Sequence, residues 1–137
     1  MRYTLFDNQR DVIILLARIL LMILFVMSGW SKMTGFSGTV EYLGSLGAPM
    51  PQVAAGVAVA MEFFIAILLI LGFYTRPLAF LFALFVVGTA VIGHPFWNMV
   101  DPARAANSVQ FFKNMSITGG LLLLAVTGAG RFSVDGR

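Results

Sequence analysis

Six ionisable or amide side chains lie within or next to apolar stretches of the chain, where they could do chemistry. They are Arg18, Lys32, Glu62, His94, Lys113 and Asn114. A charge inside a membrane-spanning helix costs about 2.5–3.5 kcal/mol on insertion scales, so it needs a partner or a function. Lysine, histidine and amide groups can hydrogen-bond an oxygen atom, and glutamate and histidine can exchange protons. These residue types predict a polar pocket suited to a quinone carbonyl or an anionic small molecule.

Four apolar stretches must position these side chains. The chain has 137 residues, of which 59% are hydrophobic and 11% are charged, whereas soluble domains carry about 25% charged residues. About 20 apolar residues are enough to cross the hydrocarbon core of a lipid bilayer. The sequence therefore predicts a single all-α domain over residues 1–137, a polytopic membrane four-helix bundle. Its helices are expected at about 12–33, 53–73, 77–93 and 109–127.

Basic residues at and beyond the ends of the helices predict the orientation of the bundle. One predicted side carries Arg2, Arg10, Arg76, Arg131 and Arg137, and the other carries Lys32 and Arg104. Because short cytoplasmic segments are rich in lysine and arginine, both termini are expected in the cytoplasm. The first apolar stretch is longer than the core of a signal peptide and contains an arginine. We therefore expect it to be retained as a helix.

The predicted depths of two charges indicate that they pair. At a rise of about 1.5 Å per residue, Arg18 lies roughly 9 Å and Glu62 roughly 15 Å from the cytoplasmic side. An arginine side chain can bridge that difference, so we predict an Arg18–Glu62 ion pair. Lys32 returns to nearly the same helix face as Arg18, because about 100° separates successive residues.

The remaining polar side chains are expected to form one cluster toward the extracytoplasmic side. The cluster contains Lys32, His94, Trp97, Gln110, Lys113 and Asn114, with Glu41 in the adjacent connection. Purely structural roles stay open beside the functional ones. The Arg18–Glu62 pair could serve only helix register, Lys32 could extend to the interface, and His94 could simply end its helix.

Several kinds of site are not expected. The chain has no cysteine and a single histidine, so thiolate chemistry, haem ligation and a di-iron centre lack ligands. Neither a glycine-rich phosphate loop nor a nucleophile elbow is present. The lysine and arginine residues are scattered, which does not predict a nucleic-acid partner. We expect no metal site, no intrinsic cofactor and no autonomous enzyme.

The order of these residues resembles the DoxX family of four-helix membrane proteins, over most of the chain from Arg18 to Asp135. The pattern begins with RILLMILFVMSGWSKM at 18–33, followed by Glu62 and LLILGFYTRP at 68–77. HPFW at 94–97 and FFKNMSITGGLLLLA at 111–125 resemble the later helices of the family. GAGRFSVD at 128–135 resembles its usual ending.

The resemblance implies a bundle in a bacterial inner membrane, with all six candidate residues at positions that match family motifs. Some members are membrane subunits of thiosulfate:quinone oxidoreductases, and another is linked to an oxidoreductase complex that handles thiol stress. Many have no assigned activity. For this chain the resemblance raises a bound quinone and a soluble or membrane oxidoreductase partner as expectations, but a quinone-linked catalytic role does not follow from it, because the chain carries no redox centre and no partner domain.

Three functions stay open at this point. The leading one is a redox-associated subunit that holds a quinone while a partner carries out the oxidation. The second is a binding or transport protein for a small anion or lipid, which with four helices would need a homo-oligomer such as a dimer. The third is a structural or assembly factor whose buried charges serve only folding.

Overall fold

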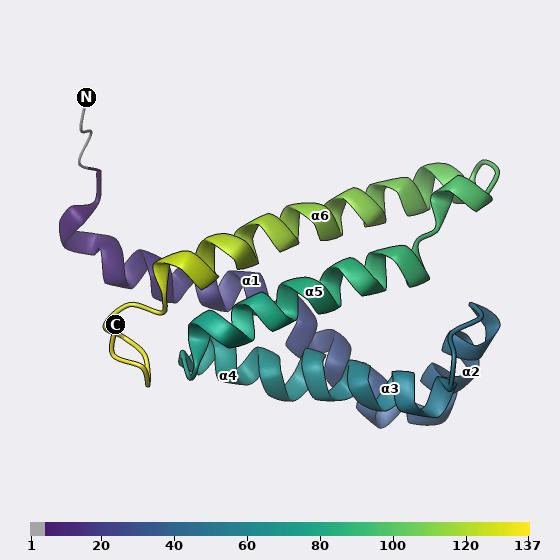
Figure 1. The fold of residues 1–137 in the computed structure, drawn as a ribbon, viewed down its shortest axis with the longest axis horizontal. Coiled ribbons are helices and arrows are strands. Elements are labelled where there is room, and N and C mark those ends of the chain that lie inside the picture. The colour runs from purple at the N-terminus through teal and green to yellow at the C-terminus, as the bar shows by residue number, and fades with distance from the viewer. Residues whose placement is uncertain (1–4) are drawn as a thin grey trace.

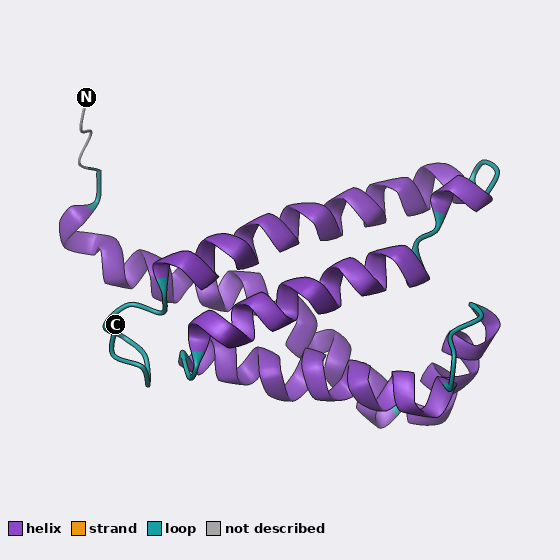
Figure 2. Ribbon diagram, in the orientation of Figure 1, coloured by secondary structure: helices purple, strands orange, loops and turns teal. Residues whose placement is uncertain are grey.

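The computed structural model describes residues 5–137, and their regular elements are helices joined by short connections (Figures 1 and 2). Four helical stretches are long and apolar enough to cross a membrane. They cover Asp7–Thr34, Pro51–Leu71, Thr75–Asn98 and Ala103–Thr127. The prediction of an all-α membrane protein with four spans is confirmed.

The first span consists of a 3-10 turn, η1 (Asp7–Gln9), and the long helix α1 (Arg10–Thr34). α1 ends at Gly35, and a second helix, α2 (Phe36–Ser45), follows at once. The sequence predicts no helix between the spans at 12–33 and 53–73, and α2 corrects that expectation. Its apolar residues Phe36, Val40 and Leu43 recur at helical spacing, but ten residues are too few to cross a bilayer.

The second span is one continuous helix with a change of winding in its middle. It begins as α3 (Pro51–Val59), with proline at the first helical position, where its missing N–H costs nothing. A π-helical segment, η2 (Ala60–Ile65), carries Glu62, and α4 (Ala66–Leu71) completes the span. Gly72 ends it with a φ of 73°, a left-handed conformation that glycine adopts without strain.

The third span contains α5 (Thr75–Gly93) and, after His94 and Pro95, the 3-10 turn η3 (Phe96–Asn98). The last span is α6 (Ala103–Thr127). α6 begins six residues before the predicted position. Asp101 explains the early start, because its Oδ1 accepts a hydrogen bond of 3.2 Å from the N–H of Ala105, in the first turn of the helix.

The four spans form an antiparallel bundle. α1 packs along the α3–η2–α4 span, and α5 packs along α6. The start of α1, the C-terminal segment and the α4–α5 turn lie at one end, while α2 and η3 lie at the other (Figure 1). The membrane side that each end faces stays a prediction, and Arg2, which contributed to it, lies outside the described residues.

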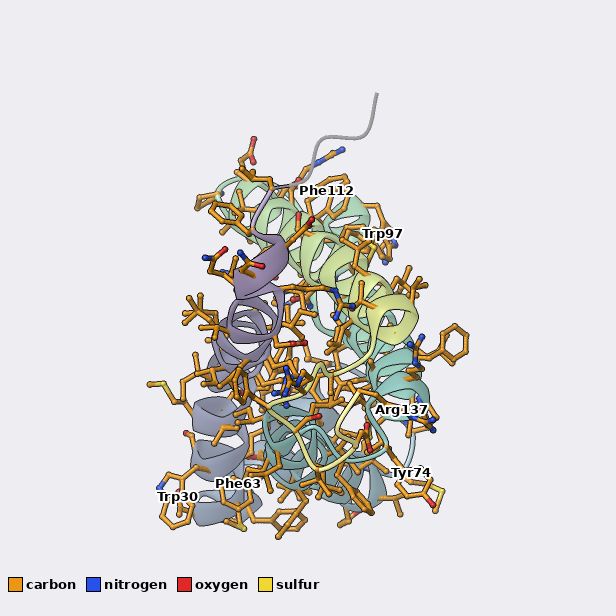
Figure 3. All side chains as sticks on the ribbon, turned by 90° about the vertical axis from the view of Figure 1, so that its left-hand side faces the viewer. Trp30, Phe63, Tyr74, Trp97, Phe112 and Arg137 are labelled. Atoms are coloured by element: carbon orange, nitrogen blue, oxygen red, sulfur yellow. The ribbon has the colours of Figure 1, made fainter. Side chains whose placement is uncertain are left out.

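The packing is that of a protein surrounded by lipid. The interior is small and includes an edge-to-face contact between Phe25 and Phe82, with ring centroids 4.9 Å apart. Large apolar side chains cover the outside of the spans (Figure 3), such as Leu20 at 65% and Leu123 at 68% exposed. An exposed apolar surface of this extent is expected where the solvent is hydrocarbon.

Candidate functional site

A cavity of about 510 Å³ lies in the half of the bundle that is distant from the two termini. Its wall is formed by α1, α2, α3, η2, α5 and α6, so each of the four spans contributes to it. Five of the six candidate residues line it: Lys32, Glu62, His94, Lys113 and Asn114. Most of the remaining lining is apolar, and it includes Leu24, Phe25, Val57, Ala58, Phe85 and Ile92.

One polar wall of the cavity is a compact group formed by Ser28, Lys32 and Glu62. Lys32 Nζ lies 2.7 Å from Glu62 Oε2 and 2.6 Å from Ser28 Oγ, and Ser28 Oγ donates to the same carboxylate oxygen over 3.1 Å. The side chain of Glu62 is 9% exposed and that of Lys32 is 30% exposed. The lysine therefore turns inward to the carboxylate rather than outward to the interface.

Two features of the backbone place Glu62 against α1. Glu62 lies in the π-helical segment, a rare winding that often occurs at functional sites. Gly29 of α1 touches the same segment so closely that an added Cβ would lie 2.6 Å from the backbone nitrogen of Phe63. Only glycine permits this approach, and the close contact puts Ser28 and Lys32 within hydrogen-bond distance of the carboxylate.

The predicted Arg18–Glu62 ion pair is wrong. Arg18 is fully buried, but its guanidinium donates to the backbone oxygens of Ile70, over 2.7 Å, and Phe132. Ile70 lies eight residues beyond Glu62, about 12 Å farther along the helix. From the sequence, either Arg18 or Lys32 could pair with Glu62. The relative positions of the helices along their axes make Lys32 the partner.

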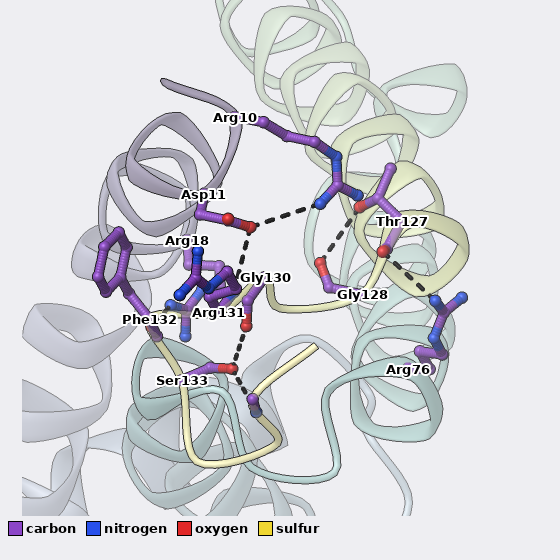
Figure 4. Close-up of polar contacts among 11 residues, drawn as sticks. Arg10, Asp11, Arg18, Arg76, Thr127, Gly128, Gly130, Arg131, Phe132 and Ser133 are labelled. Carbon is purple, nitrogen blue, oxygen red and sulfur yellow. Dashed lines mark hydrogen bonds and ion pairs between the residues drawn. The ribbon is translucent and has the colours of Figure 1, made fainter. Parts of the chain in front are cut away.

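Arg18 instead stabilises the end of the bundle that holds both termini. Figure 4 shows the segment after α6 folded back beside Arg18 and the first turn of α1. Ile70 lies in the last turn of α4, where carbonyl groups lack a partner within the helix. Arg18 thus satisfies one such carbonyl and holds the C-terminal segment through Phe132.

Acidic side chains and a second arginine reinforce this end. Asp135 accepts hydrogen bonds from the N–H groups of Tyr74 and Thr75, over 2.9 and 2.8 Å, at the beginning of α5. Asp11 accepts one from the N–H of Arg131 over 3.1 Å. Arg76 donates to the backbone oxygens of the last turn of α6, where a cation is favoured (Figure 4).

The second polar wall of the cavity comes from α5 and α6. His94 follows the last residue of α5, and its Nδ1 lies 2.8 Å from Oδ1 of Asn107 on α6. Lys113 donates a hydrogen bond to Gln110 Oε1, one helical turn earlier. Among residues 5–137 no carboxylate lies within ion-pair distance of Lys113. This wall therefore presents hydrogen-bond donors and one unneutralised positive charge.

The predicted extracytoplasmic cluster is only partly assembled. Trp97, Gln110 and Glu41 are not among the cavity-lining residues, and Trp97 packs instead on Phe96 and Phe111. Three polar side chains that were not predicted, Ser28, Tyr42 and Thr89, do line the cavity. Ser28 had a usable signal, because it precedes Lys32 by four residues and so shares its helix face.

In the part of the chain that the structure describes, no three histidine or acidic side chains lie close enough together to hold a metal ion. The polar groups of the cavity are two lysines, one carboxylate, one imidazole, one amide and the hydroxyl groups of Ser28, Tyr42 and Thr89. Such groups can bind oxygen atoms and exchange protons.

Comparison with known proteins identifies the family. The DoxX family model matches residues 13–95, which contain the whole Ser28–Lys32–Glu62 group. The chain belongs to the DoxX family. The match ends just after His94, so Lys113 and Asn114 lie on a helix beyond the matched residues.

Similarity to individual proteins extends over the full chain. The inner membrane protein YphA of Escherichia coli (strain K12) is 53% identical over 137 residues, which cover 100% of this chain and 98% of YphA. The inner membrane protein YqjF of the same organism is 40% identical and covers 91% of each chain. The protein named "Putative oxidoreductase CatD" of Bacillus subtilis (strain 168) is 36% identical over 56% of each chain. No solved structure matches the chain.

Proposed function

We propose that this DoxX-family protein is a membrane subunit that binds a quinone in its cavity and supports an oxidoreductase carried by a partner. One observation carries the proposal: a cavity of about 510 Å³ brings apolar walls together with the Lys32–Glu62 pair inside a membrane-spanning bundle. Small-molecule sites typically enclose about 300–1,000 Å³ and combine apolar walls with a few polar groups. A quinone ring has the same combination of apolar faces and two carbonyl oxygens.

The polar groups have the chemistry that such a ligand requires. Lys113 or His94 can donate a hydrogen bond to one quinone oxygen. Reduction of a quinone to a quinol takes up two electrons and two protons, and Glu62 or His94 can exchange protons. The electrons would come from the partner, because the chain has no cysteine and one histidine. The name that CatD carries supports a redox role, although only about half of each chain is matched.

The orientation that the basic residues predict places this cavity toward the extracytoplasmic side. We propose accordingly that both termini are cytoplasmic. The start of α1, the C-terminal segment and the α4–α5 turn share one end of the bundle (Figure 1), so Arg10, Arg76, Arg131 and Arg137 lie on the same side.

Native mass spectrometry of the detergent-extracted protein tests the binding of a quinone, and quinone reduction in isolated membranes tests its use. We expect a bound quinone in the wild-type protein and less of it in Lys113→Gln. Arg104→Gln is the matched control, since Arg104 also lies on α6 but does not line the cavity. A wild-type protein free of quinone, together with unaltered quinone reduction in Lys113→Gln membranes, would contradict the proposal.

A second function is favoured by the charge of the cavity. Two lysines and a histidine face one carboxylate, and Lys113 has no acidic partner among residues 5–137. A small anion or an anionic lipid would neutralise that excess. Flux of an anion in proteoliposomes that falls in both Glu62→Gln and Lys113→Gln would favour transport. Flux that persists in the double variant would exclude this cavity as the route.

A further inference from the structure

Two residues that line the cavity, one on α3 and one on α5, are about half exposed. Val57 on α3 is 49% exposed and Ile92 on α5 is 46% exposed, yet both line the cavity. α5 packs against η2 and α4, but α3 and α5 diverge toward the end that carries α2 (Figure 1). The exposure of these two residues and the divergence of the two helices point to an opening of the cavity toward the lipid-facing surface.

This proposed side opening lies one to two helical turns from the polar group. Val57 precedes Glu62 by five residues on one continuous helix, which corresponds to about 7.5 Å along the axis. Val57 is also six residues from the start of the span at Pro51, or about 9 Å inside it. A molecule in contact with Glu62 therefore has lipid beside it as well as water toward the α2 end.

One carboxylate oxygen of Glu62 is available to accept a hydrogen bond from such a molecule. Within residues 5–137, the hydrogen bonds from Ser28 and Lys32 both reach Oε2, and none reaches Oε1. Glu62 lines the cavity although its side chain is about nine-tenths buried. Oε1 is therefore free to accept a hydrogen bond from a molecule in the cavity. A hydroxyl or a protonated oxygen of a ligand would donate this hydrogen bond.

We propose that the cavity is filled sideways from the bilayer, between α3 and α5, by an amphiphile. Its polar ring or head contacts the Lys32–Glu62 pair, and its apolar tail remains between the helices and the lipid. In its quinone form the inference rests on the proposed function, because it specifies a quinone with a tail. The route itself rests on the exposed lining residues Val57 and Ile92 together with the divergence of α3 and α5, and it applies to any amphiphile of this shape.

Two glycines allow the position of the ligand to be tested without damage to the fold. Gly88 lines the cavity, whereas Gly119 on α6 does not, and an added Cβ would meet no atom within 4 Å at either position. Gly88→Leu should fill part of the cavity and lower ligand occupancy about tenfold or more, because the added side chain occupies the ligand's volume. Gly119→Leu should leave occupancy unchanged.

A second pair of variants tests the route. Val57→Trp adds bulk at the proposed opening, and Val53→Trp adds it at an exposed position of α3 that does not line the cavity. Protein in nanodiscs is mixed with vesicles that carry decylubiquinone, and the ligand adduct is followed over time by native mass spectrometry. We expect about fivefold slower uptake in Val57→Trp and wild-type uptake in Val53→Trp. Slower uptake in Leu24→Trp, on α1, with normal uptake in Val57→Trp would overturn the α3–α5 route.

The choice of probe separates this inference from the quinone proposal. Decylubiquinone should bind with an occupancy about tenfold or more above that of the same ring without its tail, because burial of the tail adds to affinity. Equal binding of both rings overturns the sideways route and leaves the quinone proposal standing. Binding of decanoic acid alone, reduced in Gly88→Leu, overturns the quinone proposal and supports the route. Binding of none of the three probes overturns both.

Discussion

The ammonium group of Lys32 lies 2.7 Å from Oε2 of Glu62, across the contact between α1 and the π-helical segment η2. This pair links two spans at the polar wall of the cavity. Removal of one partner leaves a charge in a poorly solvated site, so the two side chains should depend on each other for stability.

Lys32→Met should destabilise the protein by about 1–3 kcal/mol, less than for a fully buried pair because Lys32 remains 30% exposed. Glu62→Gln should have an effect of the same sign. The double variant Lys32→Met/Glu62→Met should lose less than the sum of the two single losses, since no unpaired charge remains. Thermal unfolding in one detergent measures all of these variants. Strictly additive losses would show that the pair has no coupling energy.

Gly29→Ala should separate α1 from η2. The added Cβ would lie 2.6 Å from the nitrogen of Phe63 and 2.7 Å from the carbonyl carbon of Glu62, so backbone must move. Overpacking of this kind costs about 1–3 kcal/mol, and the lost contact should also weaken ligand binding. Gly56→Ala is the control, because Gly56 lies in α3 and has open space around it. It should be neutral or slightly stabilising. Equal unfolding temperatures of the two variants would contradict the close contact.

Arg18→Met should release the C-terminal segment from the bundle. The backbone oxygens of Ile70 and Phe132 would lose a charged donor, and hydrogen bonds to charged groups contribute about 1.5–3 kcal/mol each. Arg18→Lys should rescue only part of the loss, because lysine lacks the planar guanidinium group that can donate to two separate carbonyl oxygens. Hydrogen exchange of residues 131–136 measures the release. Protection that is unchanged in Arg18→Met would show that other contacts suffice.

The stability of the terminus-bearing end should depend on Asp135 at acidic pH. Burial alone would raise the pKa of this carboxyl, but hydrogen bonds from Thr75 and Tyr74 and the charge of Arg137 together lower it below its ordinary value. A folded-state pKa below the unfolded value, about 3.9, means that the stabilisation is present above that value. It is lost as the pH falls through the lower folded-state pKa. Unfolding temperatures between about pH 6 and 2 should therefore decline less steeply for Asp135→Asn than for the wild type, and parallel curves would contradict the assignment.

The proposed orientation can be measured because the chain contains no cysteine. Arg137→Cys should be protected from a membrane-impermeant maleimide in intact cells, whereas Gly38→Cys on α2 should be labelled. Gly38 is a suitable position because it has open space around it. Both variants should react after the membrane is permeabilised, which controls for accessibility. The reverse pattern would show that the termini are extracytoplasmic.

Much of the fold follows from local properties of the sequence. Long apolar stretches predict the four spans because each must cover about 30 Å of hydrocarbon. Pro51 and Gly72 mark the two ends of the second span, as expected from their backbone preferences. α2 was missed because it is too short to cross a membrane, although its apolar residues have helical spacing. The early start of α6 was missed because its first turns contain polar residues and are not part of the apolar stretch. The hydrogen bond from Ala105 to Asp101 stabilises those turns.

The candidate site was predicted as a set of residues but not as a set of contacts. Lys32, Glu62, His94 and Lys113 could be identified from the sequence because few polar residues lie within or next to the apolar stretches. Their grouping around one cavity depends on which spans are neighbours and how far each is shifted along its axis.

The sequence by itself thus determined that this is a four-span membrane protein and which side chains are too polar to face lipid. Those facts depend on hydrophobicity and length, which are local. Only the tertiary structure decided that Lys32 rather than Arg18 neutralises Glu62, because ion pairing depends on the register between helices. That register depends on the close contact of Gly29 with η2. It also depends on the C-terminal segment, whose Phe132 backbone oxygen accepts a hydrogen bond from Arg18. Both connect residues far apart in the chain, whose mutual distances no local pattern encodes.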